Sequence, residues 1–539
     1  MAKRRLIVLG YVLTFWGALP GALVLLAAWG ERVMGPRLPL PDLRPAGLVL
    51  AGVSGVMLAL SIVQYTRAAG ALPISAFPPQ KLIRSGVFGI WRHPIYLFFL
   101  LLFGGLAAAF WPTGACLVAI PVLTVMTFVY ARLEERGLAK RFGSLYRGHR
   151  RQTAIVVPRL IHFVRVVSAG LGRLFFGLEV LGKEHRSLDP PLIVVSAHRC
   201  YLDPFLVLAA LGTPLHFITT SAMFRKPWSR LLFSRLLGLP VTRYKPDVRN
   251  ALEIRRRLGE GCVVGMFPEA ERTWADTMAG FKPEALRLLW NLPDVPILPV
   301  RLEGTYAVWP RWAKGPRRAK VSVRFEAPLF AGRAGSPADL EAKLSWLIGP
   351  RESPASPGSP ISSRGIETVI YRCPDCRRFG TIRSGRGARF ECSSCLADFT
   401  LLPGFTVQRA KESIGSPLAS LARSVRFGPE AGLPEEEPRL APARVKLSIE
   451  RSGRLEAAGA GRLDLAGDRL IFTSTSQAVR IDLEAIQAVV IEGARKLEVY
   501  GGRPARLHQF TVLDQSALKW QDVVIELVRR RTGFAPART

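Results

Sequence analysis

The sequence predicts a multidomain protein with a helical transmembrane domain, an α/β domain, a small domain with paired cysteines and a β-rich domain closed by one terminal helix. Long apolar runs crowd the first quarter of the chain, and short strand-like apolar runs alternate with helical stretches in the middle. Short alternating strands fill the last fifth. At 539 residues the chain is too long for a single compact core.

The charge balance is strongly basic. Lys and Arg number 74 against 41 Asp and Glu, a formal net charge of +33. In a soluble protein such an excess would indicate nucleic acid, but it also suits a protein that lies on an anionic bilayer. Because 49% of the residues are hydrophobic, we expect membrane lipids as partners and not nucleic acid.

Four apolar segments predict membrane helices, the last two joined as a hairpin. They are residues 6–29, 46–63, 96–110 and 114–130. The first could also be a signal peptide, since residues 3–5 are basic, but it is long enough to span a membrane. Basic clusters at residues 81–92 and 132–151 then place both termini and the α/β domain in the cytosol. We expect the inner membrane of a bacterium.

Charged and aromatic residues adjoin the third and fourth of these segments. Arg92, His93 and Tyr96 precede or begin the third, and Glu134 and Glu135 follow the fourth. Charged groups at a membrane edge are candidate site residues. Over about residues 45–158 the chain resembles the isoprenylcysteine carboxyl methyltransferase and phospholipid methyltransferase superfamily.

That resemblance implies that these five residues belong to an S-adenosylmethionine site. Acidic groups could hold the cofactor's ammonium group and compensate its sulfonium charge. The chain departs from the family at His149, where a second Tyr usually follows Tyr146, and this affects cofactor or substrate contact rather than fold. The alternative is that Arg92 and its neighbours only anchor lipid head groups.

Two later stretches, residues 160–181 and 224–233, combine basic and large apolar side chains at helical spacing. We interpret both as interfacial helices that lie on the bilayer. For the second, a core helix packed on the sheet is an equal alternative.

In the α/β domain, an apolar strand at residues 192–196 is followed by His198 and Asp203. An imidazole can take a proton from a hydroxyl, and a nearby carboxylate can fix its tautomer. Alone this spacing is common, and a surface histidine is the alternative. Four further blocks follow in order, at residues 238–243, 265–272, 281–282 and 295–300.

Over about residues 190–328 these blocks resemble the glycerolipid acyltransferase family, the lysophosphatidate acyltransferases and their relatives. The resemblance implies that His198 is the general base and Asp203 its orienting partner. The hydroxyl of a lipid acceptor would attack the thioester of acyl-CoA or of acyl carrier protein, which would then be a partner. It also implies that Arg243 and Arg272 bind the acceptor's phosphate, and that Glu269 orients the glycerol or an arginine.

The chain departs from this family's pattern at three places. Ala197 replaces the usual Asn, Cys200 the usual Ser, and Ala270-Glu271 the usual Gly-Thr. Cys200 could be a nucleophile, but its place in the Ser position favours packing or hydrogen bonding. Glu271 would add a carboxylate where an anionic head group approaches, so the resemblance implies the reaction type and not lysophosphatidate as the acceptor.

Two Cys-x-x-Cys pairs separated by 15 residues match the spacing of a tetrahedral zinc site. They are Cys373, Cys376, Cys392 and Cys395. Four sulfurs leave no open coordination position, so we expect a structural zinc ribbon. Zinc ribbons can bind nucleic acid, but the membrane segments argue against that role. The three other cysteines suggest no disulfide framework and favour a reducing compartment.

Composition also predicts the domain boundaries. Residues 350–365 and 405–443 are rich in Pro with Ser or Glu and are expected to be linkers. The expected domains are a transmembrane methyltransferase-like domain at 1–158, an α/β acyltransferase domain at 159–349, a four-cysteine zinc ribbon at 366–404 and a β domain at 444–539. The last loosely resembles a pleckstrin-homology-like module, and no ligand is assigned to it.

The sequence therefore predicts a membrane-bound acyltransferase of phospholipid biosynthesis or remodelling, which could also carry out S-adenosylmethionine-dependent methylation. One alternative makes methylation of a lipid or an isoprenylcysteine the main activity. The other is a non-catalytic lipid-binding scaffold in which the zinc ribbon recruits a partner.

Overall fold

The computed structural model describes residues 9–10, 12–37, 40–70, 73, 81–186, 188, 190–242, 247–351, 361–410, 412–427, 440–451 and 454–537. The basic residues 3–5, Arg243, most of the expected linker at 350–365 and the acidic run 435–437 lie outside this range. The chain divides into two compact units. The first, here called the helical unit, comprises Met1–Phe163 and Arg256–Cys262; the second, the mixed unit, comprises Val164–Arg255 and Val263–Thr539.

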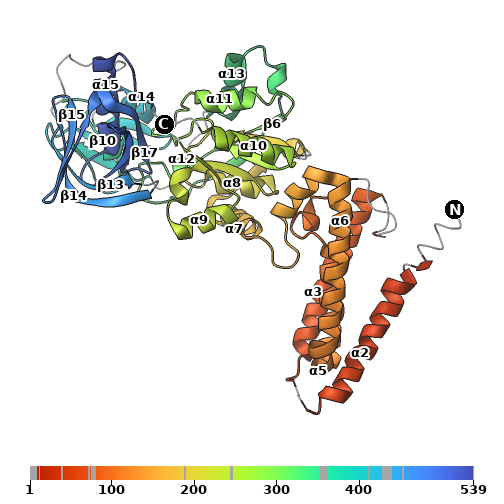
Figure 1. The fold of residues 1–539 in the computed structure, drawn as a ribbon. Helices are drawn as coiled ribbons and strands as arrows, with labels where there is room; N and C mark the ends of the chain where they lie inside the picture. Colours follow the sequence, from red (N-terminus) through yellow and green to blue (C-terminus); the bar gives the residue numbers. More distant parts are fainter. Residues whose placement is uncertain are drawn as a thin grey trace. The chain divides into compact units, whose positions relative to one another are not determined.

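The helical unit is built from long apolar helices (Figure 1). A π-helical turn, η1 (Leu13–Ala18), continues into α2 (Leu19–Met34); α3 (Arg44–Ala69), η2 (Gly86–Gly89) and α4 (Pro94–Phe110) follow, and then α5 (Pro112–Gly114), η3 (Ala115–Ala119) and α6 (Ile120–Gln152). Within the described residues, Arg44–Ala69 and Pro112–Gln152 are long and apolar enough to cross a membrane, and Pro94–Phe110 is apolar but shorter.

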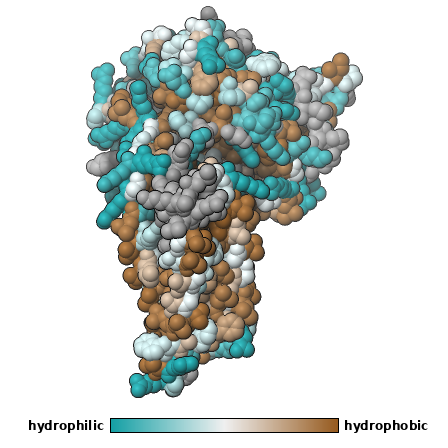
Figure 2. All heavy atoms as spheres, turned by 90° about the vertical axis from the view of Figure 1, so that its right-hand side faces the viewer, coloured by the Kyte–Doolittle hydropathy of each residue, from teal (hydrophilic) through white to brown (hydrophobic). Residues whose placement is uncertain are grey.

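Apolar side chains cover the outside of this unit. Figure 2 shows them in brown along the helices, with hydrophilic side chains in teal at the lower end. Leu25, Val49 and Val125 are 72%, 68% and 62% exposed. Large apolar side chains on the outside of packed helices are stable in lipid and not in water, so the unit is suited to a membrane.

Small residues let two of these helices approach closely. A Cβ atom added to Gly47 of α3 would lie 2.5 Å from the carbonyl oxygen of Gly105, and one added to Gly105 of α4 would lie 2.8 Å from that of Gly47. Backbones that touch in this way are typical of helix pairs in membranes, where packing replaces the hydrophobic effect.

The mixed unit begins with α7 (Leu160–Phe176), which the unit boundary divides, and a seven-stranded sheet in the order β1-β7-β6-β2-β5-β3-β4. The strands are β1 (Glu179–Leu181), β2 (Leu192–Ser196), β3 (His216–Thr220), β4 (Leu239–Val241), β5 (Val263–Met266), β6 (Ile297–Glu303) and β7 (Ser322–Phe325). All neighbours are parallel except β6 and β7. Every residue of β2 is buried, because a central parallel strand is covered on both faces.

Helices connect and cover these strands (Figure 1). They are α8 (Asp203–Leu211), α9 (Pro227–Arg235), α10 (Val248–Gly259), α11 (Pro283–Trp290), α12 (Thr305–Val308) and α13 (Pro337–Ile348). The apolar runs at residues 192–196, 262–267, 297–302 and 321–325, which predict strands, form β2, β5, β6 and β7, so the α/β domain is confirmed. The alternation of parallel strands and helices places His198 at the carboxyl end of β2, where open α/β sheets bind ligands.

Residues 361–427, here called the cysteine domain, carry a five-stranded antiparallel sheet in the order β12-β11-β10-β9-β8. Its elements are β8 (Ile382–Ser384), β9 (Arg389–Cys392), β10 (Asp398–Leu402), β11 (Thr406–Arg409), β12 (Ser416–Pro417) and α14 (Leu418–Ser424). The sequence predicts a linker from residue 405, whereas β11, β12 and α14 are formed within it. Residues 428–439 of that linker lie outside the described part of the chain.

The last part, here called the C-terminal β domain, is a seven-stranded antiparallel sheet in the order β16-β15-β14-β13-β19-β18-β17. Its elements are β13 (Ala443–Arg451), β14 (Arg454–Ala466), β15 (Arg469–Thr473), β16 (Ala478–Asp482), β17 (Ile486–Glu492), β18 (Lys496–Gly501), β19 (Arg506–Val512) and α15 (Ala517–Thr532). The apolar face of α15, including Trp520 and Val524, is buried. The β-rich end with one terminal helix is thus confirmed.

One hydrophobic core runs through three parts of the mixed unit. Trp274 and Trp312 of the α/β domain belong to the same buried cluster as Phe390 of the cysteine domain and Leu447 and Trp520 of the C-terminal β domain. Burial of such large aromatic side chains is a major favourable term in folding. The three parts therefore form one folded body rather than separate modules on linkers.

Candidate active sites

The turn between β2 and α8 brings His198 and Asp203 together. The Nδ1 atom of His198 lies 2.9 Å from Oδ2 of Asp203. The His198 side chain is 15% exposed and that of Asp203 is fully buried. A carboxylate accepts a hydrogen bond from N–H, so Nδ1 carries the proton and Nε2 keeps its lone pair. This is the tautomer that a general base needs.

Backbone donors fix the carboxylate in this place. The same Oδ2 atom of Asp203 accepts the N–H groups of Arg199 and Cys200, each at 2.6 Å. Asp203 is also the first residue of α8, where the helix dipole favours a negative charge. The geometry of the His198–Asp203 pair is therefore set by the local backbone.

Aromatic rings cover the imidazole. The ring of His198 stacks on Phe267 with centroids 4.2 Å apart, and Phe267 in turn stacks on Phe217 at 5.6 Å. Burial lowers the pKa of His198 below its usual 6.5, although the hydrogen bond and charge of Asp203 act in the opposite direction. The neutral imidazole, which can accept a proton, is thus favoured at neutral pH.

Glu269 ties the backbone of this turn to a second loop. Its Oε1 accepts the N–H of His198 and its Oε2 the N–H of Ala279, both at 3.0 Å. The side chain is buried, and this burial raises its pKa to about 7. The sequence predicts that Glu269 orients the glycerol or an arginine; its hydrogen bonds in the structure are to the backbone instead.

Arg272 stacks on an aromatic ring beside this turn. Its guanidinium lies 3.8 Å above the ring of Tyr201, which packs on Trp309 at 5.0 Å. Its Nε is buried and has no hydrogen-bond partner among the described residues. A guanidinium held flat in this way keeps N–H groups available for an anionic ligand. Arg243, the other predicted phosphate ligand, lies outside the described residues.

The departures from the family pattern have local explanations. Glu271 does not stand as a bare charge, because its Oε2 accepts a hydrogen bond from Nη1 of Arg311 at 2.8 Å. Ala270 has a φ of 59°, a left-handed conformation that the usual Gly adopts without strain. Cys200 is fully buried, and burial raises the pKa of its thiol, which fits the packing role predicted for it.

Sequence reasoning missed several neighbours of His198. Phe267 lies in the block 265–272, for which no contact with His198 was predicted, and it stacks on the imidazole. The stack of Tyr201 on Trp309 was not predicted, and neither was the Thr273 N–H, which donates to the carbonyl of His198 at 3.0 Å. Tyr201 could have been noticed as an aromatic residue between His198 and Asp203. The contact with Trp309 could not be predicted, because Trp309 is more than 100 residues from Tyr201 in the sequence.

The helical unit contains a cavity of about 370 Å³. Four of the five predicted cofactor residues line it: Arg92, His93, Tyr96 and Glu134. The fifth, Glu135, lies behind them and pairs with Arg92, with Nη1 and Oε1 2.6 Å apart. His93 Nδ1 lies 3.1 Å from Glu134 Oε2. The volume falls in the range of small-molecule sites.

Aromatic residues complete this cavity. Tyr96 stacks on His93 at 5.5 Å, and Tyr130 packs edge-on against Tyr96 at 5.5 Å. His149, the departure from the family pattern, also lines the cavity. Tyr65, Tyr130 and Arg141 line it without having been predicted. Tyr65 and Tyr130 stand at the ends of apolar runs, and Arg141 belongs to the basic cluster 132–151, which was used only to predict topology.

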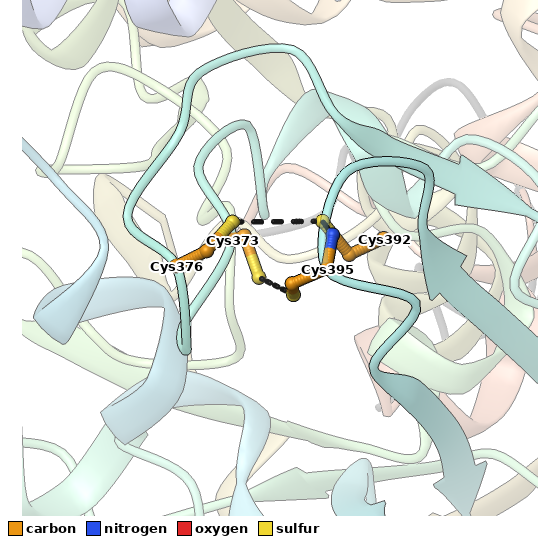
Figure 3. Close-up of side chains that lie close together, drawn as sticks. All are labelled: Cys373, Cys376, Cys392 and Cys395. Atoms are coloured by element: carbon orange, nitrogen blue, oxygen red, sulfur yellow. Dashed lines mark hydrogen bonds between the residues drawn. The ribbon is translucent and has the colours of Figure 1, made fainter.

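The four predicted metal ligands converge in the cysteine domain (Figure 3). All four sulfurs lie within 4.8 Å of one another, with Cys373 to Cys395 and Cys376 to Cys392 each at 3.7 Å. A tetrahedral zinc ion with Zn–S bonds of about 2.3 Å would place its sulfurs roughly 3.8 Å apart. The set of ligands and its dimensions fit zinc.

The turns that carry these cysteines are alike. The residue after the second cysteine of each pair, Arg377 and Leu396, has a φ of 59°. The N–H groups of Ser394 and Cys395 point at the sulfur of Cys392, at 3.4 and 3.5 Å. Backbone N–H groups directed at sulfur stabilise a thiolate, as a bound metal requires.

Comparison with known proteins assigns two regions of the chain. Residues 177–303 match the family model Acyltransferase, and residues 44–144 match the model Phospholipid methyltransferase. The N-terminal and middle parts therefore carry domains of these two families, and both resemblances predicted from the motifs are confirmed. The His198–Asp203 pair at the end of β2 lies within the region that matches the acyltransferase family.

The particular relatives are 1-acyl-sn-glycerol-3-phosphate acyltransferases. That of Chlamydomonas reinhardtii is 30% identical over 25% of this chain and 41% of its own length, and the probable enzyme of Mycoplasma genitalium is 30% identical over 21% and 45%. That of Bacillus subtilis is 24% identical over 24% and 63%. The chain thus spans between two fifths and two thirds of the length of these relatives.

Among solved structures, the chain is similar to the 1-acyl-sn-glycerophosphate acyltransferase of Thermotoga maritima. The match has 24% identity and a TM-score of 0.31, and covers 35% of this chain and 78% of the other. This score supports no comparison of individual residues.

Proposed function

We propose that the protein is a membrane-bound acyltransferase that moves a fatty acyl group from acyl-CoA or acyl carrier protein to the hydroxyl of a lysophospholipid or a related lipid. The observation that carries the proposal is the His198–Asp203 pair, with Nδ1 and Oδ2 2.9 Å apart at the carboxyl end of β2. A family match over residues 177–303 supports the same reaction class.

The reaction needs one base and no covalent intermediate. Nε2 of His198 accepts the proton of the acceptor hydroxyl while the hydroxyl oxygen attacks the thioester carbonyl, and Asp203 stabilises the imidazolium that forms. Collapse of the tetrahedral species breaks the carbon–sulfur bond. The thiolate leaves and takes up the proton from His198. Cys200 plays no part, since its buried thiol stays protonated.

Arg272 is the described residue best suited to the acceptor's phosphate. It is oriented by the ring of Tyr201 and keeps a buried Nε without a partner in the described structure. Arg243 would add a second guanidinium. Glu269 acts on the position of His198 and Ala279 through their backbone N–H groups rather than on the acceptor.

The enzyme would work at a membrane surface. We propose four membrane helices, with both termini and the acyltransferase domain in the cytosol of a bacterium and the inner membrane as the site. On α7, Phe163, Val166 and Leu174 are 65%, 61% and 77% exposed, and on α9 Trp228 is 65% exposed. Such apolar surface between basic residues suits the interface of an anionic bilayer.

The test is acyl transfer by membranes that carry the wild type or His198→Ala, with labelled acyl-CoA or labelled acyl carrier protein and a panel of lysolipids. We expect one labelled phospholipid from the wild type and a loss of about 10²- to 10⁴-fold in the variant. His185→Ala is the matched control, because His185 is a partly exposed histidine of η4 (Lys183–Arg186) and should leave the rate unchanged. Equal products from His198→Ala and the wild type would refute the proposal.

The cavity of the helical unit favours a second function, S-adenosylmethionine-dependent methylation. Its acids and aromatic side chains, with a volume of about 370 Å³, fit a cationic cofactor of that size. When bound, the cofactor would supply an electrophilic methyl group. We expect S-adenosylmethionine to raise the melting temperature of the wild type and not of His93→Ala. If neither this cofactor nor an acyl donor binds, the scaffold alternative holds.

The four cysteines would hold a structural zinc ion. Their sulfurs occupy every coordination position, so the ion would stabilise the cysteine domain and take no part in chemistry. This role supports the proposed enzyme because the cysteine domain shares its core with the α/β domain.

A further inference from the structure

A buried arginine joins the segment that carries Glu269 and Arg272 to the C-terminal β domain. Arg311 follows α12, and its side chain is 1% exposed. Its Nη1 donates to the Glu271 carboxylate at 2.8 Å and to the Arg272 carbonyl at 3.1 Å. Its Nε donates to the carbonyl of Gly493 and its Nη2 to that of Ile491, both at 2.8 Å.

These four hydrogen bonds divide evenly between two domains. Two go to residues 269–274, here called the acceptor segment, and two go to the end of β17 and the turn before β18. The guanidinium also lies 4.1 Å above the ring of Trp274, the last residue of the acceptor segment. Arg311 therefore fixes the acceptor segment from the side of the C-terminal β domain.

Burial makes both sets of contacts necessary. A guanidinium removed from water is stable only when its N–H groups and charge are met by partners. If the turn at Gly493 moved away, two N–H groups of the Arg311 guanidinium would lose their hydrogen-bond acceptors while they remained buried. Movement of either domain would thus disturb the other, which is a coupling between two sites.

We propose that Arg311 is a positioning residue that makes binding of the lipid acceptor depend on the docked C-terminal β domain. It touches no reacting atom and acts through Glu271 and the backbone of Arg272. This inference rests on the proposed acyl transfer, because it assumes that Arg272 binds the acceptor. It also gives a role to Glu271, which the family pattern does not explain.

A second arginine supplies a matched control. Arg225 pairs with Glu498 of β18, with Nη1 and Oε1 2.7 Å apart, and Gln509 of β19 donates to the same carboxylate oxygen at 2.7 Å. Arg225 thus also contacts the C-terminal β domain, but this bond does not involve the acceptor segment. Arg225→Met should weaken the same domain contact without loosening Arg272.

The kinetic test compares Arg311→Met, Arg311→Lys and Arg225→Met in the full chain. For Arg311→Met we expect the KM for the lysolipid to rise at least tenfold, with the KM for the acyl donor changed less than twofold. Arg311→Lys keeps the positive charge but not the planar guanidinium with its several N–H donors, so we expect a smaller rise in the acceptor KM. Arg225→Met should change the acceptor KM less than threefold. Equal effects of Arg311→Met on acceptor and donor would overturn the proposal.

Hydrogen exchange gives a readout that does not need turnover. In Arg311→Met, the amides of the acceptor segment should exchange at least tenfold faster than in Arg225→Met. Because coupling is reciprocal, saturating lysolipid should slow exchange of amides 491–495 in the wild type. Unchanged exchange in the acceptor segment of Arg311→Met would overturn the proposal even if no lysolipid is acylated, whereas His198-independent product would refute only the proposed function.

If Arg311→Met does not fold, Glu271→Gln replaces it. This variant keeps Arg311 and weakens its contact with the acceptor segment. We expect the same rise in acceptor KM and faster exchange at residues 491–495. A variant with wild-type KM and wild-type exchange would contradict the coupling.

Discussion

Ala270 occupies a backbone conformation that suits glycine. Its φ of 59° places Cβ in a left-handed region that costs a non-glycine residue about 1 kcal/mol or more. We predict that Ala270→Gly raises the free energy of unfolding by roughly 0.5 kcal/mol, because the extra flexibility of the unfolded glycine offsets about 0.4 to 1 kcal/mol of the strain that is removed. Thermal unfolding of purified protein in detergent would measure this.

Ala275 gives the control for that change, because it lies in the same loop, is buried, and is not among the positive-φ residues. Ala275→Gly should lower the melting temperature. A melting temperature for Ala270→Gly below that of the wild type would show that the methyl group of Ala270 contributes packing that outweighs the strain.

Glu269 predicts a pH dependence of stability. Its pKa of about 7 in the folded protein exceeds its ordinary value of 4.5, so the folded state binds the proton more tightly than the unfolded state does. The resulting stabilisation is complete below pH 4.5 and is lost as the pH rises towards 7. We therefore expect the melting temperature of the wild type, relative to Glu269→Gln, to fall between pH 4.5 and 7. Parallel profiles would contradict this.

At the scale of single residues, the sequence predicted contacts between residues that are close together in the chain. His198 and Asp203 were found because they follow one strand and lie on one turn. The pair Glu271 and Arg311 could not be found, since loops of the α/β domain bring them together. The role of Glu269 was also out of reach, because its partners are backbone N–H groups, which every residue except proline carries.

The cysteine turns form an element whose metal content can be tested. We predict one zinc ion per chain, measured by elemental mass analysis of purified protein. Cys376→Ser should lose the ion and lower the melting temperature by about 10 °C or more, because binding of a structural zinc contributes directly to folding. Cys116→Ser, which changes a cysteine outside the cluster, should keep the ion.

Chelation separates a metal role from a side-chain role. A strong chelator should lower the melting temperature of the wild type to that of Cys376→Ser and leave the variant unchanged. If the chelator removes zinc with no change in melting temperature, the four cysteines do not form a structural site.

The strand that is a continuous apolar run was predicted well, and short irregular elements were not. The strand at residues 192–196 has the same bounds in the structure as β2, because four consecutive branched or long apolar residues leave little alternative. In contrast, β12 has two residues, Ser416–Pro417, and its composition is that of a linker. A strand so short is defined by its partner β11 and not by its own sequence.

The division into two compact units predicts that the two candidate sites work independently. His93→Ala should abolish binding of S-adenosylmethionine and leave kcat/KM for acyl transfer within about twofold, because no described residue belongs to both sites and effects at sites without shared partners usually add. His198→Ala should leave the Kd for the cofactor unchanged. Calorimetry and the acylation assay on the same preparations test both halves. A loss of acyl transfer in His93→Ala would contradict independence.

For the whole molecule, the motifs predicted the two family domains and the order in which they follow one another along the chain. The family matches confirm both. The union of the α/β domain, the cysteine domain and the C-terminal β domain was not predicted. It depends on Trp274, Trp312 and Phe405, where Phe405 packs edge-on against Tyr306 at 4.7 Å. Apolar residues in loops carry no period, so nothing in the sequence shows what they cover.

The residues of this continuous core are translated at different times. Trp312 leaves the ribosome about 200 residues before Trp520, its partner in the same cluster, which at 5 to 20 residues per second is a delay of roughly 10 to 40 s. During that time the aromatic side chains Trp274 and Trp312 of the α/β domain lack the partners that the C-terminal β domain supplies. The strands of the α/β sheet are therefore all translated before the residues that complete this core.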